Sequence, residues 1–567
     1  MGSCRRGLTF WLRRRSEMEG DLMTGTAVDR RVAGLVAEYG SPDACPGALL
    51  CDRHRAEAVA FTIVEPDLSC RDLTFGELGA LSARFAEGLA RLGVGPGDAV
   101  ATLMGKSADL VVALLGIWRL GAVHVPLFTA FAPAAIAFRL AGSGAKVVVA
   151  DEDQRAKLEP GTDIPAQPPW RIISGGRPRP GDVPLAEMMA AGGAGPKAAP
   201  AVVGPAAPLV LIFTSGTTGA PKGVSLPVRA LAGISCYMEY GLDVQPGDAY
   251  WNAADPGWAY GLYYAILGPL ATGTRSILLH AGFSAPLTWQ VLQRFGVTNF
   301  AAAPTIYRAL RASDDQPAGC QLRRASSAGE PLTPDIAAWS KARLGTQVHD
   351  HYGQTEHGML IVNGWHDDVR SEVRPGSMGQ PLPGFGCAVL HNDRDEPAPA
   401  GTPGRIAVDM TASPLAHFTG YHGDTGTTER FTPDRRWWLT GDAGYADADR
   451  YYFFSARDDD VIIMAGYRIG PFDVESVLVT HDQVIEAAVI GVPDQLRGEV
   501  IEAFVVLRDP SEGTEELAGE LQQLVKDKFA AHASPRRVHF VAALPKTPSG
   551  KVQRYLLRRQ RAGSATS

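Results

Sequence analysis

The residues with the most evident chemistry form a short segment rich in Gly, Thr and Ser. The segment reads Thr214-Ser215-Gly216-Thr217-Thr218-Gly219-Ala220-Pro221-Lys222-Gly223 and follows an apolar run. A loop of this composition presents backbone N–H groups and hydroxyls, which bind polyphosphate oxygens. It is not a Walker A loop, because Gly223 follows the lysine where Ser or Thr must reach magnesium. We therefore expect a phosphate-binding loop outside the ordinary P-loop class.

Further polar segments follow this loop along the chain. They are Tyr352-Gly353-Gln354-Thr355-Glu356, Trp438-Leu439-Thr440-Gly441-Asp442, Arg457-Asp458-Asp459-Asp460 and Lys546-Thr547-Pro548-Ser549-Gly550-Lys551. Together with the loop, they resemble in composition and order the motifs of the adenylate-forming superfamily. That superfamily comprises acyl-CoA synthetases, non-ribosomal adenylation domains and luciferases. The resemblance covers residues from about 40 to 560 and is closest to the medium-chain acyl-CoA synthetases.

The resemblance implies a nucleotide site assembled from these motifs. Within it, Asp442 would bind the ribose hydroxyls and Tyr352 would face the adenine. Glu356 would be the magnesium ligand, because magnesium prefers oxygen ligands. The full set of implied ATP-binding residues is Thr214, Ser215, Gly216, Thr217, Thr218, Gly219, Lys222, Gly329, Glu330, Pro331, Asp350, His351, Tyr352, Gly353, Gln354, Thr355, Asp442, Arg457, Arg468 and Lys551.

The implied reaction explains why cations and hydroxyls are needed at this site. Attack of a carboxylate on the α-phosphate of ATP brings two anions together, so charge must be neutralised on the phosphorus and on the departing pyrophosphate. By resemblance, the catalytic residues are Lys551, Thr355 and Glu356. We expect a two-step acid:CoA ligase that uses ATP, magnesium and coenzyme A and releases AMP and pyrophosphate.

The acid itself is only partly specified. Acetyl-CoA synthetases carry Trp at the position of Gly353, and glycine leaves the acyl pocket open there. Trp258, Tyr260 and Tyr263 would add aromatic walls to that pocket. An acid longer than acetate is predicted, and a medium-chain alkyl acid and an aryl acid both stay open. His357 stands where many relatives carry Thr; it could line the pocket or simply face a loop, and we expect the latter.

The acceptor would be coenzyme A, whose phosphates need cationic partners such as Arg. The implied CoA-binding residues are Ala465, Gly466, Tyr467, Arg497, Ser534 and Arg536. Because few residues follow Lys551, we expect a free thiol as acceptor. The alternatives are a stand-alone adenylation enzyme that loads a carrier protein, an acetate or propionate ligase, and a silent nucleotide-binding sensor.

The elements that must position these residues alternate between strands and helices, which indicates an α/β fold with parallel sheets, mixed α+β overall. Thr74 and Glu77 form a capping box at the start of a helical run that ends near Gly93. Strands are predicted at 99–104, 146–150 and 209–213. Segments 328–331 and 350–356 are expected directly after strands, where open α/β sheets bind ligands.

The domain prediction combines this pattern with the resemblance. We expect a disordered or wrongly assigned leader over 1–30 and an AMP-binding N-terminal domain over 31–457. The latter would contain two α/β subdomains and a β-barrel-like piece. A hinge over 458–460, centred on Asp459, would lead to a small mobile α+β C-terminal domain over 461–560 and a tail over 561–567.

Composition excludes several other classes of protein. Against 54 Lys plus Arg stand 61 Asp plus Glu, a formal charge of -7, which argues against a nucleic-acid binder. The 7 cysteines show no zinc spacing, and no apolar run is long enough to span a membrane. We expect a cytoplasmic protein, or a mitochondrial one if the Arg-rich leader is a transit peptide, which acts as a monomer or homodimer on small molecules.

Overall fold

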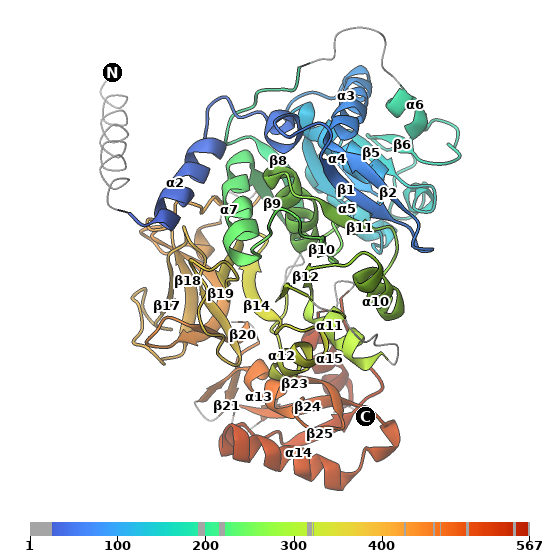
Figure 1. The fold of residues 1–567 in the computed structure, drawn as a ribbon. Coiled ribbons are helices and arrows are strands. Elements are labelled where there is room, and N and C mark those ends of the chain that lie inside the picture. Colours follow the sequence, from blue (N-terminus) through green and yellow to red (C-terminus); the bar gives the residue numbers. More distant parts are fainter. Residues whose placement is uncertain are drawn as a thin grey trace.

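The computed structural model describes residues 25–190, 199–214, 221–313, 320, 322–423, 427–457, 460–464, 467–494, 498–547 and 551–564. Over these ranges the chain forms a large N-terminal domain and a small C-terminal domain that follows Arg457 (Figure 1). The predicted α/β class with mixed α+β character is confirmed. None of the helices in these ranges is both long and apolar enough to cross a membrane.

The first sheet of the N-terminal domain is parallel up to its last strand, which runs antiparallel to its neighbour. Its order is β7-β6-β5-β3-β4-β8-β9. The predicted strands at 99–104, 146–150 and 209–213 are confirmed as β3, β5 and β8. The strands are Ala99–Leu103 (β3), Val123–Pro126 (β4), Val147–Ala150 (β5), Arg171–Ser174 (β6), Val183–Pro184 (β7), Pro208–Thr214 (β8) and Lys222–Pro227 (β9).

The second sheet has the order β17-β18-β19-β20-β16-β15-β14-β13-β12-β10-β11-β1-β2. Strands β10 to β14 and β1 pair in parallel, whereas β2 and the strands from β15 onward are antiparallel. The piece predicted as barrel-like therefore continues this sheet. The strands are Val59–Val64 (β1), Cys70–Thr74 (β2), Tyr250–Asn252 (β10), Ser276–Leu279 (β11), Asn299–Ala302 (β12), Arg324–Ala328 (β13), His349–Gln354 (β14), Gly358–Val362 (β15), Ser377–Pro381 (β16), Cys387–Leu390 (β17), Gly404–Asp409 (β18), Trp437–Ala446 (β19) and Tyr452–Arg457 (β20).

Helices surround both sheets of the N-terminal domain. As predicted, Thr74 and Glu77 form a complete capping box before the helix that follows β2, and Leu78, Phe85 and Leu89 bury its apolar face. The α-helices are Ala27–Tyr39 (α2), Phe75–Arg91 (α3), Ala108–Arg119 (α4), Pro133–Ser143 (α5), Leu185–Ala190 (α6), Leu231–Cys236 (α7), Ala259–Gly261 (α8), Gly268–Thr272 (α9), Ala285–Arg294 (α10), Pro304–Ala312 (α11) and Pro334–Arg343 (α12). Wider π-helical turns occupy Ala48–Asp52, Tyr237–Gly241 and Leu262–Leu267.

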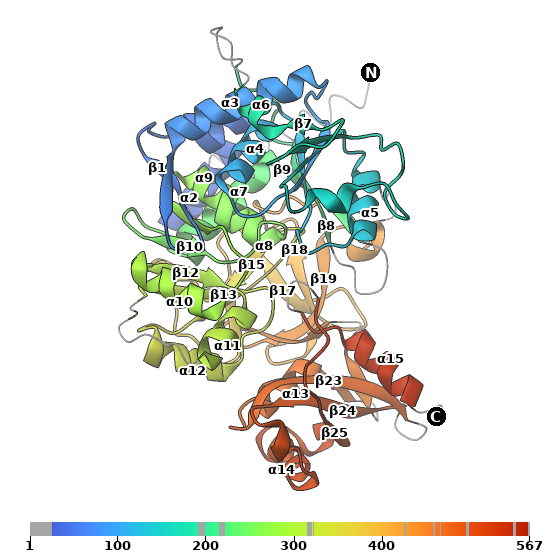
Figure 2. The same ribbon diagram turned by 90° about the vertical axis from the view of Figure 1, so that its right-hand side faces the viewer.

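The C-terminal domain has its own sheet and hydrophobic core. The sheet order is β22-β21-β24-β23, with β25 beside β24. In both views the domain lies against the end of the N-terminal domain that carries α11 and α12 (Figures 1 and 2). Its elements are Ile462–Met464 (β21), Tyr467–Ile469 (β22), Pro471–Leu478 (α13), Val484–Asp494 (β23), Gly498–Leu507 (β24), Glu515–Lys528 (α14), Arg537–Phe540 (β25) and Arg554–Ser564 (α15).

Helical segments at both ends correct the predicted boundaries. Residues 27–30 form the first turn of α2, which Thr26 and Asp29 close with a capping box, so they are not part of a disordered leader. Residues 561–564 continue α15, and Arg561 forms an ion pair with Glu502 at 2.6 Å. The folded chain therefore extends beyond the predicted limits at each end. Residues 1–24 and 565–567 lie outside the described residues.

Two predictions near the site also need adjustment. Residues 350–354 belong to β14 itself instead of following a strand, because Asp350 pairs with β13 and residues 351–354 pair with β15. Asp460, predicted as part of the hinge, forms ion pairs with Arg554 at 3.3 Å and Arg558 at 2.7 Å. These contacts attach Asp460 to α15 of the C-terminal domain. Asp458 and Asp459 lie outside the described residues, so the hinge itself stays a prediction.

Candidate active site

The predicted phosphate loop is closed by a pair of strands. Thr214 at the end of β8 and Lys222 at the start of β9 are antiparallel partners, and the Thr214 hydroxyl donates to the Lys222 carbonyl at 3.3 Å. The Lys222 ammonium lies 4.9 Å from the centre of the Tyr421 ring, a cation–π contact. The loop residues Ser215, Gly216, Thr217, Thr218 and Gly219 lie outside the described residues.

Tyr421 joins this loop to the predicted magnesium ligand. Its hydroxyl donates to Glu356 Oε1 at 2.8 Å, and both side chains are buried. Tyr421 was not predicted as a site residue, because no spacing signal separates it from ordinary core tyrosines. In the described ranges, no group of three or more His, Cys, Asp or Glu could hold a metal ion. A single carboxylate beside a phosphate loop nevertheless fits magnesium, which is held through one or two carboxylates plus substrate phosphates.

The predicted ribose corner is assembled from β14, β19 and β20. Asp442 and Arg457 are antiparallel partners, with Arg457 Nε 3.3 Å from Asp442 Oδ1. The hydroxyl of Tyr352 donates to Asp442 Oδ2 at 2.5 Å, and Gln354 Nε2 donates to the same oxygen at 2.6 Å. The Asp442 carboxylate is almost completely buried. These donors hold the carboxylate in a fixed orientation.

The predicted adenine edge follows β13 and β14. Gly329 has a φ of 102° in open space, a conformation that favours glycine. Asp350 accepts from the backbone N–H of Leu332 at 3.2 Å, and burial raises the pKa of its carboxyl to about 8. A carboxyl kept partly protonated in this way can donate as well as accept hydrogen bonds.

The side chain of His351, predicted as a nucleotide contact, points away from this edge. Its side chain is buried, with Nε2–H donating to the carbonyl of Asn363 at 3.1 Å. Its other nitrogen, Nδ1, accepts the hydroxyl proton of Tyr237 at 2.7 Å. Burial lowers the pKa of His351 to about 4, so the ring is neutral near pH 7. Because successive strand residues face opposite ways, His351 supports the strand while Asp350 and Tyr352 face the site.

The predicted catalytic lysine approaches from the C-terminal domain. The surrounding protein lowers the pKa of the Lys551 ammonium by desolvation, and Glu330 opposes this effect more strongly than Asp442 or Glu356 does. The side chain remains in contact with solvent. Lys551 therefore lies within the electrostatic field of three predicted site carboxylates, although it belongs to the other domain.

The residues of the predicted acyl wall lie in different surroundings. The Trp258 ring packs against Phe128 and Phe131, with centroid distances of 5.3 and 5.6 Å, and Tyr260 is also partly exposed. The Tyr263 ring is buried instead, and its hydroxyl donates to the carbonyl of Thr355 at 3.1 Å. The Tyr263 hydroxyl therefore anchors the Thr355 backbone, and the buried Tyr263 ring does not line the predicted acyl pocket.

Gly353 is required by the backbone around it. A Cβ at this position would lie 2.3 Å from the carbonyl oxygen of Gly358 and 2.6 Å from Cα of Met359. The pairing of β14 with β15 also shifts register at this point. A side chain at 353 would disturb that pairing, so the strand presents bare backbone here.

His357 does not face a loop, as we had expected, but lies in the core. It is buried among aromatic rings, with centroid distances of 4.8 Å to Trp438 and 5.4 Å to His417. Burial lowers its pKa well below the usual value, so the ring is neutral. Its place in the core is behind Glu356 and not on an exposed loop.

The predicted CoA-binding residues differ in exposure, and the structure describes only some of them. Ser534 is buried and donates to the carbonyl of Gln522 at 2.9 Å, which gives its hydroxyl a structural partner. The side chain of Arg536 is exposed and can meet a phosphate. Ala465, Gly466 and Arg497 lie outside the described residues. For Tyr467 and Arg468 only the backbone, in β22, is described.

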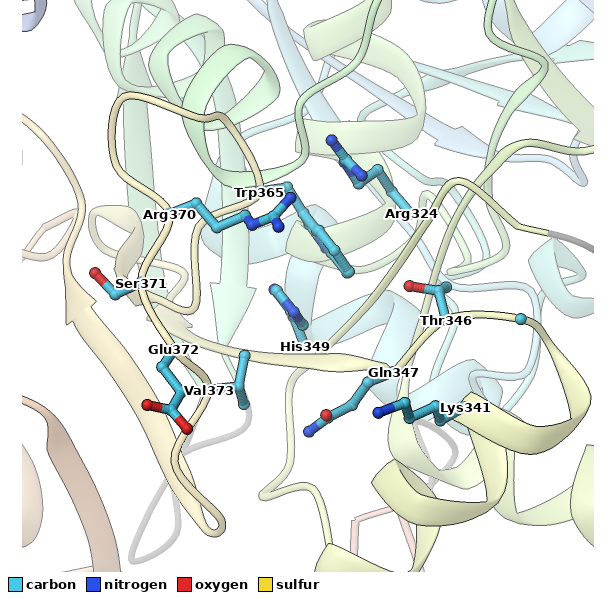
Figure 3. Close-up of a pocket in the computed structure, with 11 residues that line it drawn as sticks. Arg324, Lys341, Thr346, Gln347, His349, Trp365, Arg370, Ser371, Glu372 and Val373 are labelled. Atoms are coloured by element: carbon cyan, nitrogen blue, oxygen red, sulfur yellow. The ribbon is translucent and has the colours of Figure 1, made fainter.

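A cavity of about 670 Å³ lies away from these residues, at the start of β13 and β14 (Figure 3). His349 stacks on Trp365 with a centroid distance of 3.4 Å, and the Arg324 guanidinium lies 4.8 Å from the centre of the same ring. Arg324 also forms an ion pair with Asp243 at 2.8 Å. Because these side chains pair with one another, we interpret the residues that line the cavity as structural.

Comparison with known proteins places the chain among enzymes with this architecture. A family model described as AMP-binding enzyme matches residues 51–421, and one described as AMP-binding enzyme C-terminal domain matches residues 473–551. The acetyl-coenzyme A synthetase of Bacillus subtilis is 34% identical over 490 residues, which cover 86% of this chain and 84% of the relative.

Solved structures agree with the family match. A crystal structure of a Brucella canis acyl-CoA synthetase is 41% identical, with a TM-score of 0.73, and the match covers 96% of this chain and 99% of that one. The anthranilate CoA ligase AuaEII, solved in complex with anthranoyl-AMP, is 26% identical, with a TM-score of 0.82 and coverage of 93% and 99%. The similarity therefore extends over both domains.

Proposed function

The chain belongs to the AMP-binding enzyme family and is an AMP-forming acyl-CoA ligase, and from this premise we propose that it activates a carboxylic acid larger than acetate. The acid would be of the aryl or medium-chain type. The supporting observation is the partly exposed aromatic wall of Trp258 and Tyr260. Such a wall favours apolar and aromatic groups.

The nucleotide would be bound along the carboxyl ends of β13 and β14. Asp442 would accept from the ribose hydroxyls, because Tyr352 and Gln354 already hold one of its oxygens in place. Asp350 would meet the polar edge of the adenine. Lys222 would contact the β- and γ-phosphates from the loop that β8 and β9 close.

The first half-reaction joins the acid to AMP. The carboxylate of the acid attacks the α-phosphate, and pyrophosphate leaves as the P–O bond to it breaks. Lys551 would neutralise the charge that develops at the α-phosphate, the kind of preorganised electrostatic stabilisation that dominates many enzymes. Thr355, whose carbonyl Tyr263 fixes, would donate its hydroxyl to the same phosphate. Magnesium, when held by Glu356, would neutralise the departing pyrophosphate.

The second half-reaction would transfer the acyl group to coenzyme A. We propose that the C-terminal domain rotates about Asp459, withdraws Lys551 and brings its other face, which includes Tyr467, to the site. Arg536, being exposed, would then pair with a CoA phosphate, since Arg matches phosphate geometry.

The test is a screen for acid-dependent pyrophosphate release. Acids from acetate through dodecanoate, together with benzoate and its amino and hydroxy derivatives, are assayed with and without CoA. We expect benzoates or C6 to C12 acids to surpass acetate, with thioester formed only when CoA is present. Highest activity on acetate or propionate would contradict the proposed acid, and adenylation without thioester formation would favour a carrier protein as acceptor.

The variant Trp258→Ala tests whether this wall sets the acid range. Removal of the ring should change the ranking of acids while the KM for ATP stays within about twofold. An unchanged ranking would show that the acyl group binds elsewhere.

A further inference from the structure

We propose that a chain of ion pairs across the two domains, Lys546–Glu486–Arg308–Glu330, holds the C-terminal domain where Lys551 faces the nucleotide site. This chain is called the interdomain ion-pair chain below. It makes Arg308 and Glu486 positioning residues for the adenylation half-reaction alone. The inference rests on the proposed function, since it divides that reaction into two steps with different domain positions.

The contacts run without a break from one domain to the other. Arg308, on α11 of the N-terminal domain, donates from Nη2 to Glu330 Oε2 at 3.0 Å. Its Nε lies 3.7 Å from Oε1 of Glu486, on β23 of the C-terminal domain. The same Glu486 oxygen accepts from the Lys546 ammonium at 2.6 Å. Positive and negative charges therefore alternate across the boundary.

The surroundings of this chain make it stronger than a surface ion pair. The side chains of Glu330, Glu486 and Arg308 are 15%, 19% and 21% exposed. Isolated exposed pairs contribute little, whereas partly desolvated charges with several partners interact more strongly. The interdomain ion-pair chain can therefore bias the equilibrium between two domain positions.

Both ends of the chain act on the loop that carries Lys551. Lys546 and Val552 are antiparallel bridge partners, and the N–H of Thr547 donates to the Lys551 carbonyl at 2.7 Å. Lys546 and Lys551 therefore lie close to each other on two antiparallel segments. At its first end the loop is held through Glu486, and at its second end Glu330 is the carboxylate with the strongest influence on Lys551.

Rotation of the C-terminal domain would divide the chain at a single contact. Glu486 and Lys546 would move together, while Arg308 and Glu330 would stay on the N-terminal domain. The Arg308–Glu486 contact therefore exists only in the domain position described here. An interaction present in one state and absent from the other shifts the equilibrium by its own free energy.

The experiment measures the two half-reactions separately in the full chain. Adenylation is followed as acid-dependent ATP–pyrophosphate exchange, and thioester formation as conversion of supplied acyl-AMP plus CoA. Arg308→Met and the isosteric Glu486→Gln should each lower exchange by about 5- to 50-fold, the usual range of such coupling. Thioester formation should stay within about twofold of the parent.

Two further variants provide matched comparisons. Arg311→Met removes a charge one turn along α11, but that residue pairs with Asp335 inside the N-terminal domain, so exchange should be unaffected. Arg308→Lys keeps the charge and should restore part of the exchange. The double variant Arg308→Met, Glu486→Gln should be no worse than the more affected single variant, because both remove the same contact.

The outcomes separate this inference from the proposed function. Equal loss of both half-reactions in folded variants, or additive effects in the double variant, would overturn the positioning role and leave the proposed function intact. A parent protein that supports exchange with none of the acids in the screen would overturn both. A selective loss of exchange, absent in Arg311→Met, is the result that supports the inference.

Discussion

The side chains on one face of strand β14 pack in the core, whereas those on the other face lie at the candidate site. On one side, His349 and His351 both donate to the carbonyl of Asn363, at 2.7 and 3.1 Å, and His349 also stacks on Trp365. On the other side, Asp350 and Tyr352 are placed between β13 and β19, where Tyr352 meets Asp442. Every second residue therefore belongs to the core, and the alternate ones belong to the site.

The two faces of β14 differ in how burial affects the protonation of their ionisable side chains. The histidines are neutral because burial lowers the pKa of His349 to about 3 and that of His351 to about 4. Their hydrogen bonds are satisfied inside the protein, which is the normal condition of buried polar groups. Asp350 is buried instead with a raised pKa, because desolvation disfavours its charged form. Groups kept in such surroundings are frequent at functional sites.

The largest effect should come from the residue that approaches the Asp350 side from the other domain. Lys551→Ala should lower acyl-AMP formation by about 10²- to 10³-fold, the usual result of removing one preorganised charge from a reacting phosphate. Conversion of supplied acyl-AMP and CoA to thioester should remain near the parental rate. Rapid-quench assays of each half-reaction measure this split. If both rates fell together in a folded protein, one rigid active site would be the better account.

A smaller effect is expected at the ribose corner. Asp442→Asn removes the charge that Tyr352, Gln354 and Arg457 surround. Hydrogen bonds to a charged group contribute about 1.5 to 3 kcal/mol, so the KM for ATP should rise roughly 10- to 100-fold. The urea midpoint should change little, because the amide still accepts one hydrogen bond. Unchanged nucleotide affinity, measured by calorimetry, would remove Asp442 from this role.

The smallest effect concerns stability and has opposite signs on the two sides of β14. An unfolded His titrates near 6.5, so the stability due to neutral His349 is present above that pH and is lost as pH falls toward 3. An unfolded Asp titrates near 3.9, so the stability due to protonated Asp350 is present below that pH and is lost as pH rises toward 8. Between about pH 4 and 6.5 the two slopes oppose each other.

Single variants should separate these slopes. Asp350→Asn should gain stability relative to the parent as pH rises from 5 to 8, and His349→Gln should gain relative to the parent as pH falls from 6.5 to 4.5. Each slope should approach about 1 kcal/mol per pH unit in the free energy of unfolding, followed by urea denaturation. Parallel pH profiles of the unfolding free energy for parent and variants would show that burial does not shift the pKa of either group in this way.

Much of the site could be predicted from short-range patterns. The composition of the Gly- and Thr-rich loop suits phosphate chemistry, which depends on side-chain type and not on packing, whereas the segment Tyr352–Glu356 and Lys551 were predicted from the resemblance of their motifs to those of the family. The capping box at Thr74 and the strands at 99–104 and 146–150 were predictable for the same local reason. Alternating strands and helices also indicated the α/β class.

The sequence by itself determined which chemistry this chain can perform, because cations, carboxylates and glycines are fixed by residue type and order. Only the tertiary structure decided which side of β14 each residue faces, since strand alternation defines two sets but the register with β13 and β15 decides which set is buried. That choice placed the side chain of His351 in the core. It also brought Arg308 to Glu486, residues 178 positions apart, because a contact between domains depends on how two separately folded cores meet.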